Sequence, residues 1–344
     1  MKSKKILTFG EVLGRFSTKK SITIRQAQEY DIHYGGCELN VAIALSNMGK
    51  IQPSFFTVLP YNEKLTAPII DILNTYRIDS KIIRSEGRLG LYFLETGASV
   101  RQSDVIYDRD YSSISLYDYS NLDIEDLLND FSWIHLSGIT AALSNTCKKL
   151  IMRVLEIAKS MGIMVSFDIN YRKSLWSMEE AEEFVTYCLP YINLLIGLKP
   201  LKLFDKNGVD LIKDLKKDHT YEEAKNIIEA LHEQYPNLNY IYDPIRLPSE
   251  SSDKSSTMAY FSYKGEIYTS QPETFEVIDR VGSGDASTAG VIYGLMNGMN
   301  PQEIVDYAKW SGILTHTILG DYSTFTAEEI LAHCNGGNNC DVNR

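Results

Sequence analysis

The residues most suited to chemistry lie in a glycine-rich turn near the C-terminal end of the chain, DRVGSGD at 279–285. A short strand predicted over 275–278 runs into this turn, and a helix begins directly after it. Glycines at a helix N-terminus let backbone N–H groups converge on an anion, and the helix dipole adds positive potential. Such a turn is suited to a phosphate oxygen, and Asp285 in the first helical turn could accept a proton from an attacking hydroxyl.

Other interpretations of this turn start from its position and spacing. Gly282 and Gly284 could simply form a tight turn, with Asp285 as a helix cap, because short glycine turns before helices are common. A dinucleotide-binding fingerprint is disfavoured, since the pattern occurs near the C-terminus without a strand and an acidic residue ~20 positions later. An ordinary P-loop is excluded because the chain contains no G-x-x-x-x-G-K-[ST].

The elements that must position this turn alternate between strand and helix from residue 131 onward. Strands are predicted at 5–9, 133–138, 163–170, 193–198 and 239–245. Helices are predicted at 37–49, 147–162, 179–192, 221–235, 284–298 and 301–315. This rhythm indicates a parallel sheet wound by right-handed crossovers, and 247–257 is predicted to be a polar loop.

A smaller β element is predicted from two stretches in which polar and apolar residues alternate, 21–34 and 89–109. Their alternation favours exposed antiparallel strands, whose edges would form a dimer surface or cover a cleft. The predicted parts are an α/β domain over 1–11, 35–88 and 113–334, a β lid over 12–34 and 89–112, and a flexible tail at 335–344.

The composition excludes several classes of protein. The 344 residues are 44% hydrophobic and carry a formal net charge of −11, which disfavours general nucleic-acid binding because phosphate neutralisation needs a basic face. No apolar run approaches the ~20 residues of a membrane span, and the N-terminus reads as a strand and not as a signal peptide. The widely spaced cysteines predict reduced thiols in the cytoplasm; they are Cys37, Cys147, Cys188, Cys334 and Cys340. The 22 tyrosines predict many aromatic rings that pack against apolar residues on one side and face water or polar groups with their hydroxyl.

A second glycine motif decides between the interpretations of the first. YGGCELNVAIALSNMG at 34–49 places Asn40 four residues after a Gly-Gly pair, at the start of a predicted helix. Together with the late Asp-x-x-Gly-x-Gly-Asp, it resembles the two signatures of the ribokinase-like carbohydrate kinases of the phosphofructokinase-B type. The segments FGEVLGRFS (9–17), HLSGIT (135–140) and FDINYRKSLW (167–176) resemble most the 2-dehydro-3-deoxygluconate kinases within that family.

This resemblance implies a three-layer α/β/α fold with a mostly parallel sheet and a small β-sheet lid. It also implies ATP-dependent phosphorylation of 2-dehydro-3-deoxy-D-gluconate to its 6-phosphate, with ATP and Mg²⁺ as cofactors and a homodimer joined through the lid. By the same resemblance, Asp285 is the general base, and the anion hole consists of Val281, Gly282, Ser283 and Gly284. The residues implied to bind the sugar acid are Gly35, Gly36, Asn40, Tyr92, Tyr107, Arg109 and Arg172.

The two arginines also have a physical reason to recognise this substrate. A keto-deoxy acid carries a carboxylate, to which arginine offers a permanently charged, bidentate fork. Tyr107 and Arg109 are two residues apart on a predicted strand, so their side chains point to the same face. The alternative for Arg109 and Arg172 is a surface ion pair, which would be worth little energetically.

The chain departs from the family pattern at two places. Gly197 and Pro200 stand where an Asn-x-x-Glu motif usually organises magnesium, and the nucleotide segment reads YIYDPIRLPSESSDKSST at 240–257. Magnesium neutralises phosphate charge in this chemistry, so either a neighbouring acid substitutes for the missing carboxylate or transfer is slow. The remaining alternatives are a sugar-acid binding or sensor protein without turnover, and a kinase of a neutral sugar such as fructose, against which the two arginines argue.

Overall fold

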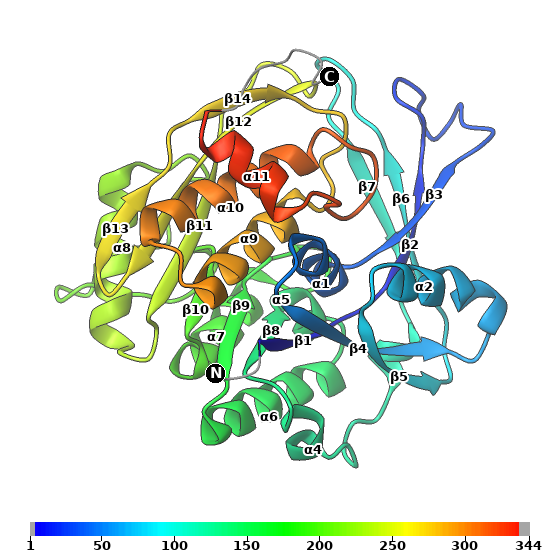
Figure 1. Cartoon of the computed structure of the whole chain (residues 1–344), viewed down its shortest axis with the longest axis horizontal. Helices are drawn as coiled ribbons and strands as arrows, with labels where there is room; N and C mark the ends of the chain where they lie inside the picture. Colours follow the sequence, from blue (N-terminus) through cyan, green and yellow to red (C-terminus); the bar gives the residue numbers. More distant parts are fainter. Residues whose placement is uncertain (1–3, 337–344) are drawn as a thin grey trace.

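The computed structural model describes residues 4–336, and its centre is a ten-stranded sheet (Figure 1). The strands follow the order β13-β12-β11-β10-β9-β8-β1-β4-β5, and β14 pairs with β12. The parallel strands are β1 (Lys5–Phe9), β4 (Gln52–Pro60), β5 (Asp79–Ser85), β8 (Trp133–Ser137), β9 (Met164–Asp168), β10 (Leu194–Ile196) and β11 (Tyr240–Leu247). The antiparallel strands at one edge are β12 (Lys254–Tyr263), β13 (Glu266–Thr269) and β14 (Glu273–Glu276).

Helices cover both faces of this sheet, because its strands are apolar on both sides. In β1, Ile6 packs into the core beneath one helix layer, and its neighbour Leu7 packs into the core beneath the other. The first layer contains α1 (Cys37–Met48), α2 (Glu63–Thr75), α9 (Ser283–Asn297), α10 (Pro301–Thr315) and α11 (Ala327–Cys334). The second contains α6 (Asn145–Met161), α7 (Met178–Cys188) and α8 (Tyr221–Gln234), with the short α3 (Ser113–Leu116), α4 (Ile124–Leu128), α5 (Gly138–Ala142) and η1 (Leu189–Tyr191). The expected three-layer fold is therefore confirmed.

A separate four-stranded sheet, called the small sheet below, stands apart from the main one (Figure 1). It has the order β3-β2-β6-β7, formed by β2 (Leu13–Ser17), β3 (Asp31–Gly35), β6 (Gly90–Glu95) and β7 (Asp104–Asp108). Its outer pairs are antiparallel, but β2 and β6 are parallel, which corrects the expectation of antiparallel strands throughout. The reason is topological: β2 continues from β1 and β6 follows β5, and both leave the main sheet at the carboxyl ends of parallel strands.

Several local predictions were wrong in extent. The strand predicted over 21–34 begins only at Asp31, and the loop predicted over 247–257 shrinks to 248–253 because β11 and β12 extend into it. The strand predicted over 275–278 lies two residues earlier, as β14.

No described helix is long and apolar enough to cross a membrane. Cys37, Cys147, Cys188 and Cys334 are free thiols, whereas Cys340 and residues 337–344 of the predicted tail lie outside the described residues.

Candidate active site

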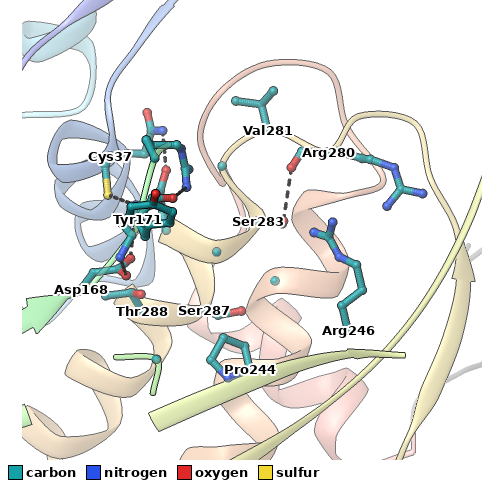
Figure 2. Close-up of a pocket in the computed structure, with 18 of the residues that line it drawn as sticks. Cys37, Asp168, Tyr171, Pro244, Arg246, Arg280, Val281, Ser283, Ser287 and Thr288 are labelled. Carbon is teal, nitrogen blue, oxygen red and sulfur yellow. Dashed lines mark hydrogen bonds between the residues drawn. The ribbon is translucent and has the colours of Figure 1, made fainter. Parts of the chain in front are cut away.

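A cleft of about 1290 Å³ opens where the parallel strands of the main sheet end (Figure 2). The ends of β9, β10 and β11, the small sheet, and the N-terminus of α9 all contribute residues to its lining. In open α/β sheets, ligands bind outside the carboxyl ends of the strands. A pocket for one small ligand usually measures ~300–1,000 Å³, so this cleft has room for two substrates side by side.

Asp285 connects the two glycine motifs of the sequence. Its carboxylate accepts a 2.7 Å hydrogen bond from Nδ2 of Asn40, and Oδ1 of Asn40 accepts one of 3.2 Å from the backbone N–H of Gly36. Burial raises the pKa of Asp285, while hydrogen bonds from Asn40 and Cys37 oppose that rise. The structure thus holds an oriented carboxylate with enhanced basicity in the first turn of α9.

A second carboxylate lies beside the first and was missed by the sequence analysis. Asp168 ends β9, and one ligand atom from each of Asp168, Asp285 and Cys37 falls within 4.8 Å of the others. Burial raises the pKa of Asp168 to about 7, with the charge of Asp285 adding to the effect and Arg172 opposing it. The signal that could have found Asp168 is its place at the end of a buried strand, next to the quoted Arg172.

The glycine turn leaves α9 without a side-chain cap, and its glycines differ in their surroundings. Gly282 has a φ of 76°, and a Cβ there would lie 1.9 Å from the backbone oxygen of Asp321. At Gly284, by contrast, a Cβ would meet nothing within 4 Å. The backbone N–H of Val281 donates to the side chain of Asp279 at 3.2 Å, so the N–H groups that remain available to an anion at this turn belong to Gly282, Ser283 and Gly284.

A buried ionic network fixes this turn to the small sheet. The sequence analysis named Asp279 as the first residue of the glycine motif, but it predicted neither the ion pair of Asp279 nor a role for Asp321. Arg15 on β2 contacts Asp279 at 2.5 Å and Asp321 at 2.9 Å, with 3% of its side chain exposed. Burial disfavours the charge of Arg15, but Asp321 and Asp279 outweigh this and raise its pKa. The hydroxyl of Tyr92 donates to the other oxygen of Asp321 at 2.7 Å, so Tyr92 lines the cleft while its polar end belongs to this network.

The predicted substrate arginines have different partners. Arg109 is buried and ion-paired with Glu11, and its guanidinium lies 5.3 Å from the ring centroid of Tyr107. The half-buried Arg172 donates one hydrogen bond among the described residues, at 3.2 Å to the carbonyl of Tyr171. The side chains of Tyr107, Arg109 and Arg172 all line the cleft. Of the two arginines, only Arg172 keeps most of its N–H donors free of protein partners.

Comparison with known proteins places the chain in a family. The model of the pfkB family carbohydrate kinases matches residues 3–197, which is more than half of the chain. The chain belongs to this family. Its similarity extends over the whole fold: the crystal structure of 2-dehydro-3-deoxygluconokinase from Thermotoga maritima is 32% identical with a TM-score of 0.87, covering 96% of this chain and 99% of that one.

Two curated relatives show the same breadth of similarity to this pfkB-family chain. The 2-dehydro-3-deoxygluconokinase of Bacillus subtilis is 26% identical over 95% of this chain and 94% of its own length. The 2-dehydro-3-deoxygalactonokinase of Haloferax volcanii is 24% identical over 96% of this chain and 97% of its own length. The resemblance stated from the sequence is therefore confirmed, and the chain is a carbohydrate kinase.

The segment after β10 offers no carboxylate for the Mg²⁺ implied by the resemblance. Gly197 and Pro200 line the cleft but carry no metal ligand in their side chains. Two strands pair with β10. One of them, β11, contributes Asp243, which is buried and paired with His219 at 2.7 Å, and the other, β9, ends in Asp168 beside Asp285. The donor set at this position does not fit a resident magnesium, since hard cations require available oxygen ligands.

The different surroundings of the two glycines predict that an alanine substitution affects stability at Gly282 and activity at Gly284. We expect Gly282→Ala to lower the free energy of unfolding by about 1–3 kcal/mol, because it combines a positive φ with the close carbonyl of Asp321. Gly284→Ala should unfold like the wild type but transfer phosphate more slowly, since its methyl group would occupy the space beside the anion-hole donors. Chemical denaturation and a coupled kinase assay measure the two effects; equal stability of the two variants would contradict the assignment.

The Arg15 network predicts a large contribution to stability. Arg15→Ala should lower the free energy of unfolding by about 3–5 kcal/mol, because it leaves Asp279 and Asp321 buried without a counter-charge. Arg88→Ala is the matched control, since its ion pair with Asp108 is solvent-exposed and should change stability little. Urea denaturation of both variants gives the comparison, and a similar small effect for both would show that the network is not a structural anchor.

Proposed function

We propose that the chain transfers the γ-phosphoryl group of ATP to 2-dehydro-3-deoxy-D-gluconate and forms its 6-phosphate. The observation that carries this proposal is the placement of Asp285, a half-buried carboxylate held by Asn40 directly beside an uncapped glycine turn. The names of the relatives from Thermotoga maritima and Bacillus subtilis support a sugar-acid substrate. The galactonate epimer, named for the relative from Haloferax volcanii, belongs to the same substrate class.

In this reaction each group has one task. The acceptor hydroxyl oxygen attacks the γ-phosphorus of ATP while the bond from that phosphorus to the bridging oxygen breaks, ADP leaves, and the hydroxyl proton passes to Asp285. The N–H groups of Gly282, Ser283 and Gly284 stabilise the charge on the transferring group. Mg²⁺ bound to the nucleotide would neutralise phosphate charge, although the residues after β10 do not fit a resident ion.

Carboxylate recognition in this proposal falls mainly to Arg172. Its guanidinium faces the same cleft as Asp285, and the charges of Asp285 and Asp168 lie close enough to interact with it. Arg109 would contribute less to carboxylate binding, since its ion pair with Glu11 already neutralises much of its charge. A neutral sugar such as fructose would leave the free donors of Arg172 without a matching acceptor, which disfavours that alternative.

A second candidate function is binding of a sugar acid without transfer. Its one supporting observation is the absence of a side-chain carboxylate at Gly197 and Pro200, and membership of the carbohydrate-kinase family weighs against it. A coupled ADP-release assay with the sugar acid separates the two: saturable binding without turnover in the wild type would favour the binding protein.

We also propose a cytoplasmic location and a homodimer formed through the small sheet. The sheet exposes apolar residues that a partner could cover, among them Ile32 and Ile106, which are 53% and 50% exposed. The assembly stays a prediction.

Replacing the proposed base isolates the chemical step. Asp285→Asn should lower kcat by about 10²–10⁴-fold while leaving sugar-acid binding intact, because the amide can still accept the hydrogen bond from Asn40 but cannot take a proton. Asp214→Asn, which removes an exposed carboxylate outside the cleft, is the control. Steady-state kinetics and isothermal titration calorimetry give both quantities, and near-normal turnover of Asp285→Asn would refute the assignment.

Replacing the proposed carboxylate receptor tests substrate class. Arg172→Ala should weaken binding of the sugar acid by about 10- to 100-fold, the range expected for hydrogen bonds to a charged group. Binding of the uncharged methyl ester of the same acid should change little, and Arg172→Lys should restore part of the loss. Calorimetric titration of both ligands provides the test. Equal weakening for acid and ester would mean that Arg172 does not read the carboxylate.

A further inference from the structure

Two arginines converge on the side of the cleft opposite the carboxylates (Figure 2). Arg246 rises from β11 toward the glycine turn, and Arg280 lies in the segment just before α9. Cys37 and Asp168 lie across the cleft from them, on the other side of Ser283. The cleft therefore has an acidic half around Asp285 and a cationic half around Arg246.

The cationic half has no sufficient counter-charge within the protein. The side chain of Arg246 is exposed in the cleft and forms no hydrogen bond and no ion pair with any residue in the described range 4–336. The surrounding protein still desolvates its guanidinium enough to lower its pKa, and burial together with the charge of Arg246 lowers the pKa of Arg280. Asp253, whose charge opposes the shift of Arg280, is already paired with Lys20 at 3.0 Å.

The remaining neighbours also lack negative charge that could satisfy Arg246. Arg280 is anchored by two backbone carbonyls, those of Ser252 at 2.8 Å and Lys254 at 2.9 Å. His316 is kept neutral, because burial lowers its pKa to about 4 and both arginines add to that effect, while its ring nitrogen hydrogen-bonds the carbonyl of Asp279 at 2.8 Å. Hydrogen bonds to the protein therefore account for the position of the Arg280 side chain, whereas none accounts for that of Arg246.

We propose that Arg246, held beside Arg280 and the glycine turn, binds the phosphate chain of the nucleotide donor and supplies charge neutralisation that a carboxylate-anchored magnesium would otherwise provide. This inference rests on the proposed phosphoryl transfer, and it identifies the residue that binds the phosphates of the nucleotide donor. A guanidinium matches the geometry of phosphate oxygens with two parallel N–H groups and keeps its charge at all physiological pH values. Arg246 lies in the segment 240–257, which departs from the family pattern. In this proposal the departure supplies the cationic group that binds the phosphates of the nucleotide.

The position of Arg246 also agrees with the direction of transfer. Ser283 of the glycine turn lies between the two arginines and the pair Cys37 and Asp168, beside which Asp285 lies. A nucleotide whose terminal phosphate reaches the turn would therefore extend its other phosphates over the cationic half. The acceptor would then occupy the acidic half, with its hydroxyl at Asp285. This arrangement keeps the two anionic substrates apart except at the reacting atoms, which limits their mutual repulsion.

The test compares Arg246→Ala and Arg246→Lys with Arg25→Ala, which removes an exposed arginine outside the cleft. We expect Arg246→Ala to raise the KM for ATP and the dissociation constant for ADP by about 10- to 100-fold, while the affinity for the sugar acid and the melting temperature stay unchanged. Arg246→Lys should recover part of the loss, and Arg25→Ala should behave like the wild type.

Titration of ADP separates the failure of this inference from that of the proposed function. If the wild type transfers phosphate and Arg246→Ala keeps its KM for ATP and its affinity for ADP, the role of Arg246 is overturned and the kinase function stands. If the wild type shows no turnover but Arg246→Ala still loses ADP affinity, the phosphate receptor stands and the proposed transfer is wrong. Equal loss of ADP and sugar-acid binding would mean a general structural defect and would also overturn the inference.

Discussion

The buried contacts of Arg15 with Asp279 and Asp321 tie together three parts of the molecule that are far apart in the sequence. Arg15 belongs to the small sheet, Asp279 begins the glycine turn, and Asp321 lies in the loop after α10. The second oxygen of Asp279 accepts the N–H of Val281, so the same carboxylate that meets the small sheet also shapes the turn. Loss of Arg15 would leave Asp279 and Asp321 as buried, unpaired charges, so we expect the shape of the glycine turn, and with it the proposed anion hole, to depend on this network.

The fold was largely predictable, because its strands and helices carry strong local signals. The predicted helix at 301–315 matches α10, which has a capping box at Asn300 and Glu303, and the predicted helix at 147–162 ends on Gly162 in the left-handed conformation that glycine favours. The strands β4 and β5 were not identified, and the parallel pairing of β2 with β6 was missed. Strand direction in the small sheet follows from where each strand leaves the main sheet, and no local pattern encodes that.

The site was predicted only where a residue stands inside a recognisable motif. Asp285, Asn40 and the glycines were found in this way, and the structure brings them together. The partners of charged side chains could not be predicted, because they depend on distant segments: Glu11 neutralises Arg109, and Asp321 takes the hydroxyl of Tyr92. The expectation that Tyr92 and Tyr107 contact substrate stays a prediction, although both line the cleft.

The two halves of the cleft carry opposite charges on opposite sides of the glycine turn. Burial raises the pKa values of Asp285 and Asp168, which penalises their negative charge, whereas the side chain of Arg246 is exposed in the cleft and has no acidic partner among the described residues. The glycine turn lies between these groups, so they do not neutralise each other as an ion pair would. A phosphate chain would relieve the cationic half, and an acceptor hydroxyl would give the carboxylates a donor. The separation of charge across the cleft is therefore the feature that would select and orient two different substrates.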